Sequence, residues 1–477
     1  MRCRSYFQYD RIAVKGEFQP FVRLDEEITM LAADMLGIKD AFKGARGDDP
    51  AKALEAMKEK EWLIKARFEY GGLRIKVPFL HRTENGWDLY FLFAGLFPRA
   101  DDITYYTATA WVLDKLDIDI DNIAVIHLNK DYERQDALDT KQMFIISSYF
   151  YNGKNNPTVL VQEALVKSWC DYSAVIAQMD SCTHEQAEPV RTSRCTGRRK
   201  CNYYDTCFPN EKEERCESIT TLIASQHKYQ MKNEGLLRLR DADPERIEGS
   251  RQQYAQIMAD RNGGLFADRL ALRSWLSYVK YPVTFLDFEW ERFAIPPYRG
   301  MHPYDVLLFE YSTHVLYEDG RIDHNVFLSI HDDRRELTES LLADIPETGT
   351  VVAYNAEGAE KIRISELMAY FPEYADRLAS INERMEDLQI PFETGTVYDT
   401  RMRGTWSLKT FMALLDDSSF RDLDINEGMQ AVFQWRHLDY MEDEENSEKI
   451  IEDLKAYCGM DSYAMLAVFR WLKKIAG

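Results

Sequence analysis

The sequence lacks the features of a membrane or secreted protein. Its 477 residues contain no apolar run of about 18 residues, the length a membrane-spanning helix needs. The N-terminus, MRCRSYFQYDRI, is polar and basic and lacks the apolar core of a signal peptide. We therefore expect a cytoplasmic protein with no membrane partner.

The chain also has few cysteines and no net positive charge. Eight cysteines in a cytosolic chain of this size do not indicate a disulfide framework. The formal net charge is −21, so the chain as a whole is a poor electrostatic match for a polyanion. A nucleic acid is not excluded, because a channel can be locally basic and a site built from metal-binding carboxylates is acidic by construction.

The chain is too long for a single core, and its texture divides it into three regions. Residues 1–209 mix strand and helix patterns, with a hairpin predicted from strands at 77–80 and 87–93 around Glu84-Asn85-Gly86, and a buried strand at 123–128. Residues 210–274 are helical and charged, as expected for a connector. Residues 275–477 alternate strands and helices, which predicts a three-layer α/β domain.

The third region supplies the most specific expectations. Its first three strands are close in sequence, which predicts an antiparallel meander. A final helix is expected with Ser447 as its N-cap. The acidic run EDEENSE at 442–448 is expected to be a solvated loop. The predicted strands are 284–288, 305–311, 326–330 and 350–353, and the predicted helices are 357–371 and 447–475.

Two carboxylates interrupt the first of these strands, which reads FLDFEW at 285–290. Alternate residues of a strand share a face, so Asp287 and Glu289 project together. Paired carboxylates on a rigid strand are suitable ligands for a hard cation such as Mg²⁺. Taken alone, the pair is a weak signal, and solvated acids at a strand end are the simpler interpretation.

The final helix and the region before it add further polar residues in a defined order. Tyr457 and Asp461, in YCGMD, are four residues apart and therefore share one helical face. Between them and the strand pair lies VVAYNAEGAEKIRISEL at 351–367, which places Asn355 after a strand and Glu357 and Glu360 just beyond it.

This order resembles the DnaQ-like, or DEDD, 3′–5′ exonucleases of the RNase H-like fold, in the subclass with a tyrosine in its last motif. The resemblance implies that Asp287, Glu289 and Asp461 bind two Mg²⁺ or Mn²⁺ ions and that Tyr457 orients a water. The family usually has an aspartate four residues after the asparagine, but here position 359 is Ala359. Glu360 is the nearest replacement.

Glu357 is the alternative to Glu360 as the second-motif acid. Three other residues fall on segments similar to family motifs. Lys409, in GTWSLKTFMALL at 404–415, could approach the substrate backbone, although an exposed helix lysine is the simpler interpretation. Asp387, in MEDLQIPF at 385–392, is either structural or supports the metal ligands. His314 follows the strand after FLDFEW and is more often structural at such a place.

A cysteine cluster closes the N-terminal region. Positions 191–209 read RTSRCTGRRKCNYYDTCFP, and three cysteines this close in a cytosolic protein indicate metal binding. A closed site needs a fourth ligand, for which Cys3 is the best candidate and Cys182 the alternative. The flanking bases, available for phosphates or simply solvated, are Arg191, Arg194, Arg198, Arg199 and Lys200.

The segment CRSYFQYD and the later cysteines resemble RecB-like nucleases that carry an iron–sulfur cluster. The resemblance implies a [4Fe-4S] cluster, with Zn²⁺ as the alternative, and a restriction-endonuclease-type PD-(D/E)XK fold for residues 1–209. The implied cluster ligands are Cys3, Cys195, Cys201 and Cys207.

The resemblance implies a RecB-like domain that has lost its own catalytic residues, since the metal-binding and lysine positions of the family are filled by other side chains here. Pro78 stands where the family has an aspartate, Phe91 and Phe93 stand where it has glutamate and lysine, and Thr109 replaces a glutamine. A shifted alignment would bring in Asp101 or Asp102 instead.

Together these patterns predict a metal-dependent exonuclease that hydrolyses phosphodiester bonds of DNA or RNA, carrying a catalytically dead RecB-like domain that binds substrate or partner. The alternative hypothesis is a non-catalytic protein that binds nucleic acid or acts as a scaffold in a repair or defence complex.

Overall fold

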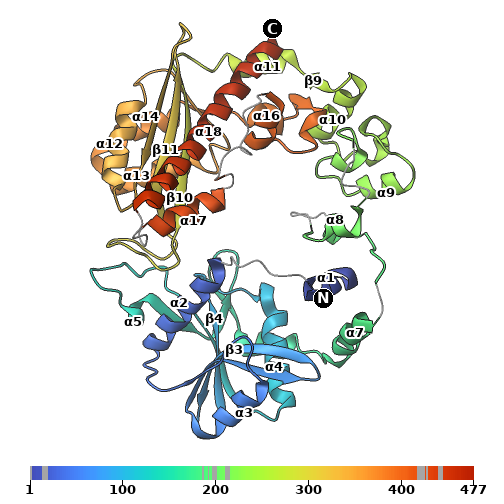
Figure 1. Ribbon diagram of the computed structural model, residues 1–477, viewed down its shortest axis with the longest axis vertical. Helices are drawn as coiled ribbons and strands as arrows, with labels where there is room; N and C mark the ends of the chain where they lie inside the picture. The colour runs from blue at the N-terminus through green and yellow to red at the C-terminus, as the bar shows by residue number, and fades with distance from the viewer. Residues whose placement is uncertain are drawn as a thin grey trace. The chain divides into compact units, whose positions relative to one another are not determined.

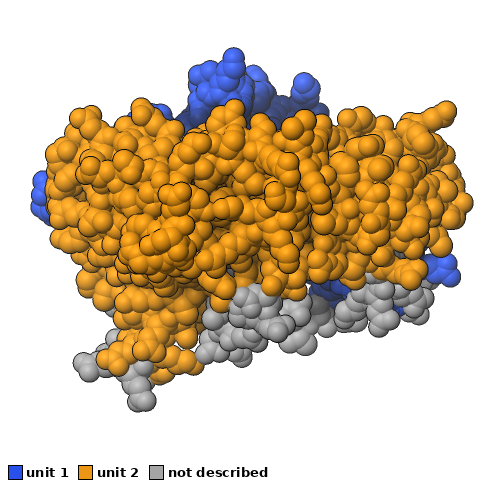
Figure 2. All heavy atoms as spheres, turned by 90° about the horizontal axis from the view of Figure 1, so that it is seen from above, with its two compact units in different colours: residues 1–209, 292–305 blue, residues 210–291, 306–477 orange. Residues whose placement is uncertain are grey.

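The computed structural model divides into two compact units, coloured separately in Figure 2: residues 1–209 with 292–305, and residues 210–291 with 306–477. Both units are mixed α/β. No helix in the described part of the chain is long and apolar enough to cross a membrane. The described residues are 3–12, 20–184, 187–191, 193–195, 201–209, 215–415, 425, 428–438 and 444–477.

The first unit is built on a six-stranded sheet with the order β1-β2-β3-β4-β5-β6. Its larger elements are α1 (Arg4–Ile12), α2 (Pro20–Met35), β1 (Phe42–Lys43), α3 (Pro50–Glu59), β2 (Trp62–Tyr70), β3 (Leu73–Arg82), β4 (Trp87–Phe93), α4 (Ile103–Lys115), β5 (Ile120–Leu128), α5 (Thr140–Met143), β6 (Phe144–Ser147), β7 (Tyr149–Tyr151), β8 (Pro157–Leu160), α6 (Val161–Lys167), α7 (Ser173–His184) and α8 (Tyr204–Cys207).

The predicted hairpin and buried strand of this unit are confirmed. β3 and β4 pair antiparallel, with Arg82 opposite Trp87 across the turn. β5 contains the apolar run that was predicted as a strand, and it lies parallel to β4 because α4 crosses over between them. Two apolar cores, one centred on Trp111 and one on Phe79, occupy the two sides of the sheet.

A segment distant in sequence completes this unit. Residues 292–305 connect two strands of the second unit but pack within the first. Gly300 N donates to Arg134 O at 2.8 Å, Arg134 N donates to Met301 O at 2.9 Å, and Ala294 is buried in the core beside Phe79. The sequence patterns of residues 275–477 did not predict that residues 292–305 belong to the first unit, because this packing depends on long-range contacts.

The second unit contains a five-stranded sheet with the order β12-β11-β10-β13-β14. Its larger elements are α9 (Lys228–Asn233), α10 (Arg251–Arg261), β9 (Leu265–Ala267), α11 (Arg269–Leu276), β10 (Val283–Arg292), β11 (Val306–Leu316), β12 (Ile322–Leu328), α12 (Arg334–Asp344), β13 (Thr350–Ala353), α13 (Glu360–Tyr370), α14 (Ala375–Glu383), β14 (Met385–Asp387), α15 (Ile390–Glu393), β15 (Val397–Asp399), α16 (Leu408–Leu415), α17 (Gly428–Leu438) and α18 (Glu444–Ala476).

Helices cover both faces of this sheet. Figure 1 shows α12, α13 and α14 on one side and the long α18 on the other. Leu286 and Phe288 of β10 pack against the first group of helices, whereas Phe285 meets Phe469 of α18 with ring centroids 5.5 Å apart. Even-numbered and odd-numbered residues of β10 therefore face opposite layers, as strand geometry requires. The four predicted strands and the antiparallel pairing of β11 with β12 are confirmed.

Two predicted helix starts are wrong. The final helix begins at Glu444, so Ser447 lies inside it and is not its N-cap, and residues 444–448 of the acidic run are helical rather than a loop. The helix expected from 357 begins at Glu360 instead. Asn355 adopts a left-handed conformation, with φ of 64°, and a turn follows it before the helix starts.

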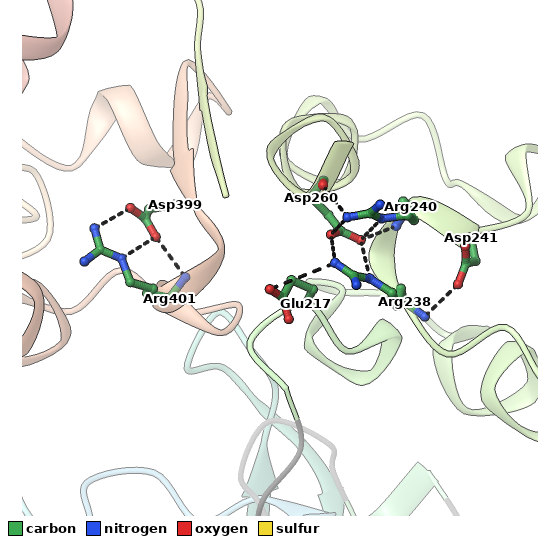
Figure 3. A network of polar contacts seen from close by, with 7 residues as sticks. All are labelled: Glu217, Arg238, Arg240, Asp241, Asp260, Asp399 and Arg401. Carbon is green, nitrogen blue, oxygen red and sulfur yellow. Dashed lines mark hydrogen bonds and ion pairs between the residues drawn. The ribbon is translucent and has the colours of Figure 1, made fainter. Parts of the chain in front are cut away.

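A buried carboxylate joins two parts of the helical segment before β10. Asp260 on α10 is 1% exposed and accepts hydrogen bonds from the side chains of Arg238 and Arg240 (Figure 3), the second at 2.7 Å. A backbone N–H of Arg240 adds a third bond, at 3.0 Å. Burial acts to raise the pKa of Asp260, but these hydrogen bonds outweigh burial and hold the pKa well below its usual value.

Asp260→Asn is expected to destabilise the protein by about 2 kcal/mol, because two guanidinium groups lose their charged acceptor. Since the folded pKa of Asp260 lies below the unfolded value, its stabilising effect is present above about pH 4 and is lost as pH falls through the folded value. The measurement is urea unfolding at pH 7 and pH 3, the second below the ordinary pKa of an aspartate. Asp243→Asn, at a half-exposed turn of the same segment where Asn can still accept the hydrogen bond from Glu245 N, is the control, and equal losses in the two variants would contradict the role given to Asp260.

Candidate metal centre

Three of the predicted ligands meet in the second unit. Among the described residues, the one set of three candidate ligands with atoms all within 4.8 Å of one another consists of Asp287, Glu289 and Asp461. The first two project from β10 toward α18, and Asp461 comes from α18 itself. The period of two in the strand and the contact between helix and sheet together bring the carboxylates to one place.

The electrostatics of this group favour a bound cation. Burial raises the pKa of Asp287 and Glu289 well above the ordinary values, and the neighbouring charge of Asp461 raises both further. Burial likewise raises the pKa of Asp461 to about 7, although Lys409 and a hydrogen bond from the Tyr457 side chain oppose the shift. Carboxylates held this close repel one another, and a divalent ion with oxygen ligands would relieve that repulsion.

Of the two candidates for the second-motif acid, Glu360 is the one that lies near this group. It is 3% exposed, and its Oε2 has no hydrogen-bond partner among the described residues. Burial raises its pKa to about 8, and its own charge contributes to the raised pKa of Asp287. Glu360 is outside the set of three within 4.8 Å. Glu357 is exposed and forms an ion pair with Lys361 at 2.5 Å.

Asp387 fixes the start of α13. Its carboxylate accepts hydrogen bonds from the backbone N–H groups of Asn355 at 3.0 Å, Ala356 at 3.0 Å and Gln389 at 2.8 Å. Three backbone donors satisfy this side chain, so its role is structural. By holding the turn before the helix, Asp387 sets which residue of the helix faces the carboxylates.

Tyr457 and Lys409 border the same group. Tyr457 is 4% exposed on α18, one turn before Asp461. The Nζ of Lys409, on α16, lies 5.6 Å from the centre of the Tyr457 ring, and its charge lowers the pKa of both Asp461 and Glu289. Lys409 is therefore an exposed helix lysine, as the simpler interpretation held, that also lies near the carboxylates.

His314 packs against α18 and β12, next to the carboxylate group. Its Nδ1 lies 2.8 Å from Ser462 Oγ, and its ring stacks on His324 with centroids 4.1 Å apart. Burial and the charge of His324 lower its pKa to about 4. His314 joins β11, β12 and α18 through these contacts.

Sequence reasoning missed two residues beside the carboxylates. Cys458 is fully buried, and its Sγ lies 3.8 Å from Asp287 Oδ2. Glu310 on β11 is 0% exposed, and burial raises its pKa to about 8. A signal for Glu310 existed, because it interrupts the apolar run VLLFEYSTHVL in the way that Asp287 and Glu289 interrupt FLDFEW.

The predicted cysteine ligands gather in the first unit. Burial raises the pKa of the Cys207 thiol, and the charges of Cys3, Cys201 and Cys195 add to that effect, in this order. Cys201 N donates to Cys195 O at 2.8 Å. The alternative ligand, Cys182, is buried at 2% exposure on α7 and does not contribute to the raised pKa of Cys207.

Aromatic contacts hold the N-terminal helix against the later cysteines. The rings of Tyr6 and Tyr203 have centroids 5.1 Å apart, and Tyr203 donates to Asp10 Oδ1 at 3.2 Å. These contacts account for the approach of Cys3 to cysteines that lie far along the chain. Of the predicted bases, Arg191 packs 4.6 Å from the Phe208 ring and Arg194 is exposed, while Arg198, Arg199 and Lys200 lie outside the described residues.

The positions of the expected nuclease site in the first unit hold apolar side chains in packed surroundings. Phe91 is 0% exposed in the core, Phe93 packs beside it, and Pro78 is buried on β3. Thr109 is buried and donates to Tyr105 O at 2.9 Å. Asp101 and Asp102, the acids of a shifted alignment, lie exposed in a short helix, Ala100–Asp102.

Comparison with known proteins gives one match. Residues 284–407 match a family described as a domain of unknown function (DUF2779). The match begins at β10 and ends just before α16, so it contains Asp287, Glu289 and Glu360 but not Tyr457 or Asp461. No curated protein and no solved structure matches the chain.

Proposed function

We propose that the second unit is a metal-dependent 3′–5′ exonuclease of the DnaQ-like type, with an RNase H-like fold, that hydrolyses phosphodiester bonds of DNA or RNA. The observation that carries the proposal is the approach of Asp287, Glu289 and Asp461 to within 4.8 Å, from a strand and a helix far apart in sequence. The burial of Glu360 beside them supports it, because a solvated Glu360 would have favoured a protein that only binds.

The residues fit two Mg²⁺ or Mn²⁺ ions. Asp287, Glu289, Glu360 and Asp461 would hold them. When bound, such a pair supplies an activated water and stabilises the attacking and leaving oxygens of phosphodiester hydrolysis. Four acidic side chains, of which Glu360 has one oxygen without a hydrogen-bond partner among the described residues, suit hard cations better than any neutral ligand.

The surrounding side chains would orient the substrate and the water. Tyr457 is bonded to Asp461 and faces the same group, so its hydroxyl is placed to hold the attacking water. Lys409 brings a positive charge to the edge of an acidic site, where it would bind a phosphate of the nucleic acid. Both are positioning roles.

We further propose that the first unit is a RecB-like domain without its own nuclease activity. The succession of α3, β2, β3, β4, α4 and β5 supports this, because it is a helix, three antiparallel strands, a crossover helix and a parallel strand. The apolar surroundings of Phe91 exclude a bound Mg²⁺ at that position. The domain would then bind nucleic acid or a partner.

The four cysteines fit a [4Fe-4S] cluster better than a single zinc ion. In a tetrahedral zinc site with Zn–S bonds of about 2.3 Å, all sulfurs lie within about 4 Å of one another. Among the described residues, the set of three ligands within 4.8 Å is made of carboxylates, so the cysteine sulfurs are spaced more widely than zinc requires. A larger cluster accommodates such spacing.

The nuclease proposal is tested with 5′-labelled single-stranded and double-stranded DNA and RNA in the presence of Mn²⁺. Wild-type protein is expected to shorten at least one substrate from its 3′ end and to stop when EDTA is added. Asp287→Ala is expected to be inactive. Asp323→Ala, which removes an exposed carboxylate from β12 of the same sheet, is the matched control. Equal activity in the Asp287 variant and the wild type would exclude this site.

A further inference from the structure

Glu310 is a buried acid for which the contacts of the folded chain provide no partner. It is 0% exposed, and neither Oε1 nor Oε2 has a hydrogen-bond partner among the described residues. A buried polar group without a partner is rare in folded proteins, and a buried carboxylate without one is costly. Such a side chain, on a strand between two others of the sheet, indicates a ligand that the chain itself does not supply.

The position of Glu310 on its strand places its side chain on the face of the sheet where Asp287, Glu289 and Asp461 lie. β11 is the neighbour of β10 in the sheet. Two residues after Glu310, the hydroxyl of Ser312 lies within hydrogen-bond distance of Cys458 O, at 2.6 Å, and of Ser462 Oγ, at 2.7 Å, both on α18. Since alternate residues of a strand share a face, Glu310 also faces α18, at the level of Cys458 and Asp461.

Electrostatic interactions agree with this placement. After burial itself, the charge of Glu310 is the largest contribution to the raised pKa of Cys458, whose Sγ lies 3.8 Å from Asp287 Oδ2. The same charge acts on Asp287 and Glu289. Lys455, the cation that acts on Glu310, is exposed on α18 and forms no hydrogen bond with either oxygen.

We propose that Glu310 is a fifth carboxylate of the divalent-ion site, which accepts hydrogen bonds from water molecules bound to the ion. It lies outside the set of three ligands within 4.8 Å, as expected of a side chain that reaches the ion through water. Mg²⁺ usually keeps several of its waters when it binds to protein carboxylates, and those waters need acceptors. Glu310 is therefore a positioning residue, and this role rests on the proposed metal-dependent function.

The test measures Mn²⁺ affinity by calorimetry in the absence of nucleic acid. Glu310→Gln is expected to weaken binding by about 10- to 100-fold, the usual effect of removing a group that holds metal-bound ligands. The control is Glu386→Gln on β14 of the same sheet, where the carboxylate is half-buried away from the group and binding should equal that of the wild type. Glu310→Met provides a second variant of similar size.

Both Glu310 variants are expected to melt in EDTA at a temperature no lower than that of the wild type, because they remove a buried acid that has no partner. Unchanged Mn²⁺ affinity in both would overturn the role of Glu310. Asp287→Asn separates the two proposals. If it abolishes Mn²⁺ binding while the Glu310 variants bind normally, the metal site stands and only Glu310 is misassigned, whereas a wild-type protein that binds no Mn²⁺ contradicts the metal site and the nuclease function together.

Discussion

Asp461→Asn is expected to lower the hydrolysis rate at least about a thousand-fold and yet to stabilise the metal-free protein. A thousand-fold loss corresponds to about 4 kcal/mol of transition-state stabilisation, within the range that a catalytic metal supplies. The stability gain has a different cause. Asp461 is the neighbouring charge with the largest effect on the pKa of Asp287 and Glu289, and removing it relieves repulsion among buried acids.

The pH dependence of this gain follows from the direction of the pKa shifts. The folded pKa of Asp461 is about 7, above the unfolded value of about 4, so the folded state binds more protons between these two values. Its contribution to stability therefore falls as pH rises through that range. Thermal melts in EDTA should show Asp461→Asn more stable than the wild type at pH 8, with little difference near pH 4.

Asp323→Asn is the matched control for both measurements, since it removes a carboxylate from an exposed ion pair with Arg321. It should leave the hydrolysis rate and the melting temperature unchanged. An Asp461→Asn protein that melts below the wild type in EDTA at pH 8 would contradict the proposed repulsion. A variant that retains the wild-type rate would remove Asp461 from the metal site.

The sequence predicted the parts of the site that depend on local periodicity. Asp287 and Glu289 share a face because a strand has a period of two, and Tyr457 and Asp461 share one because a helix brings residues four apart together. These two pairs were correctly placed on β10 and α18. Their approach to one another came from the family resemblance, because no local pattern reports a contact between residues so far apart.

The choice between Glu357 and Glu360 shows why the rest of the candidate site could not be predicted from the sequence. It depends on where α13 begins, and that start is set by Asp387, which bonds the backbone N–H groups of Asn355 and Ala356 from β14. The amphipathic pattern alone extended the helix back to Glu357. A tertiary hydrogen bond therefore decides which carboxylate is buried, and only the folded chain contains it.

Glu310 was missed for a related reason. Glu310 interrupts an apolar run, and every residue of β11 is buried, but neither fact shows whether this acid lies beside the metal ligands. What distinguishes Glu310 is the strand beside it and the helix above it. Sheet order is a long-range property, and the run VLLFEYSTHVL gives no information about which strand it pairs with.

Cys207→Ser is expected to abolish binding of the proposed iron–sulfur cluster and to destabilise the first unit. Cys207 interacts electrostatically with all three other proposed ligands. Cys3 lies directly before α1 and Cys207 in α8, so a bound cluster would tie these two segments together. Because bound metal groups can contribute on the order of 10 kcal/mol to the folding of the segments that hold them, loss of one ligand should release the N-terminal helix. Anaerobically purified wild type should absorb near 400 nm, and the variant should not.

The matched control is Cys170→Ser, because Cys170 is an exposed cysteine of the same unit outside the proposed ligand set. It should retain the absorbance, the iron content and the melting temperature of the wild type. Limited proteolysis should cleave Cys207→Ser near the N-terminus faster than it cleaves the wild type or Cys170→Ser. A colourless wild type that contains zinc would contradict the iron–sulfur assignment, and a Cys207→Ser protein with unchanged absorbance would exclude Cys207 as a ligand.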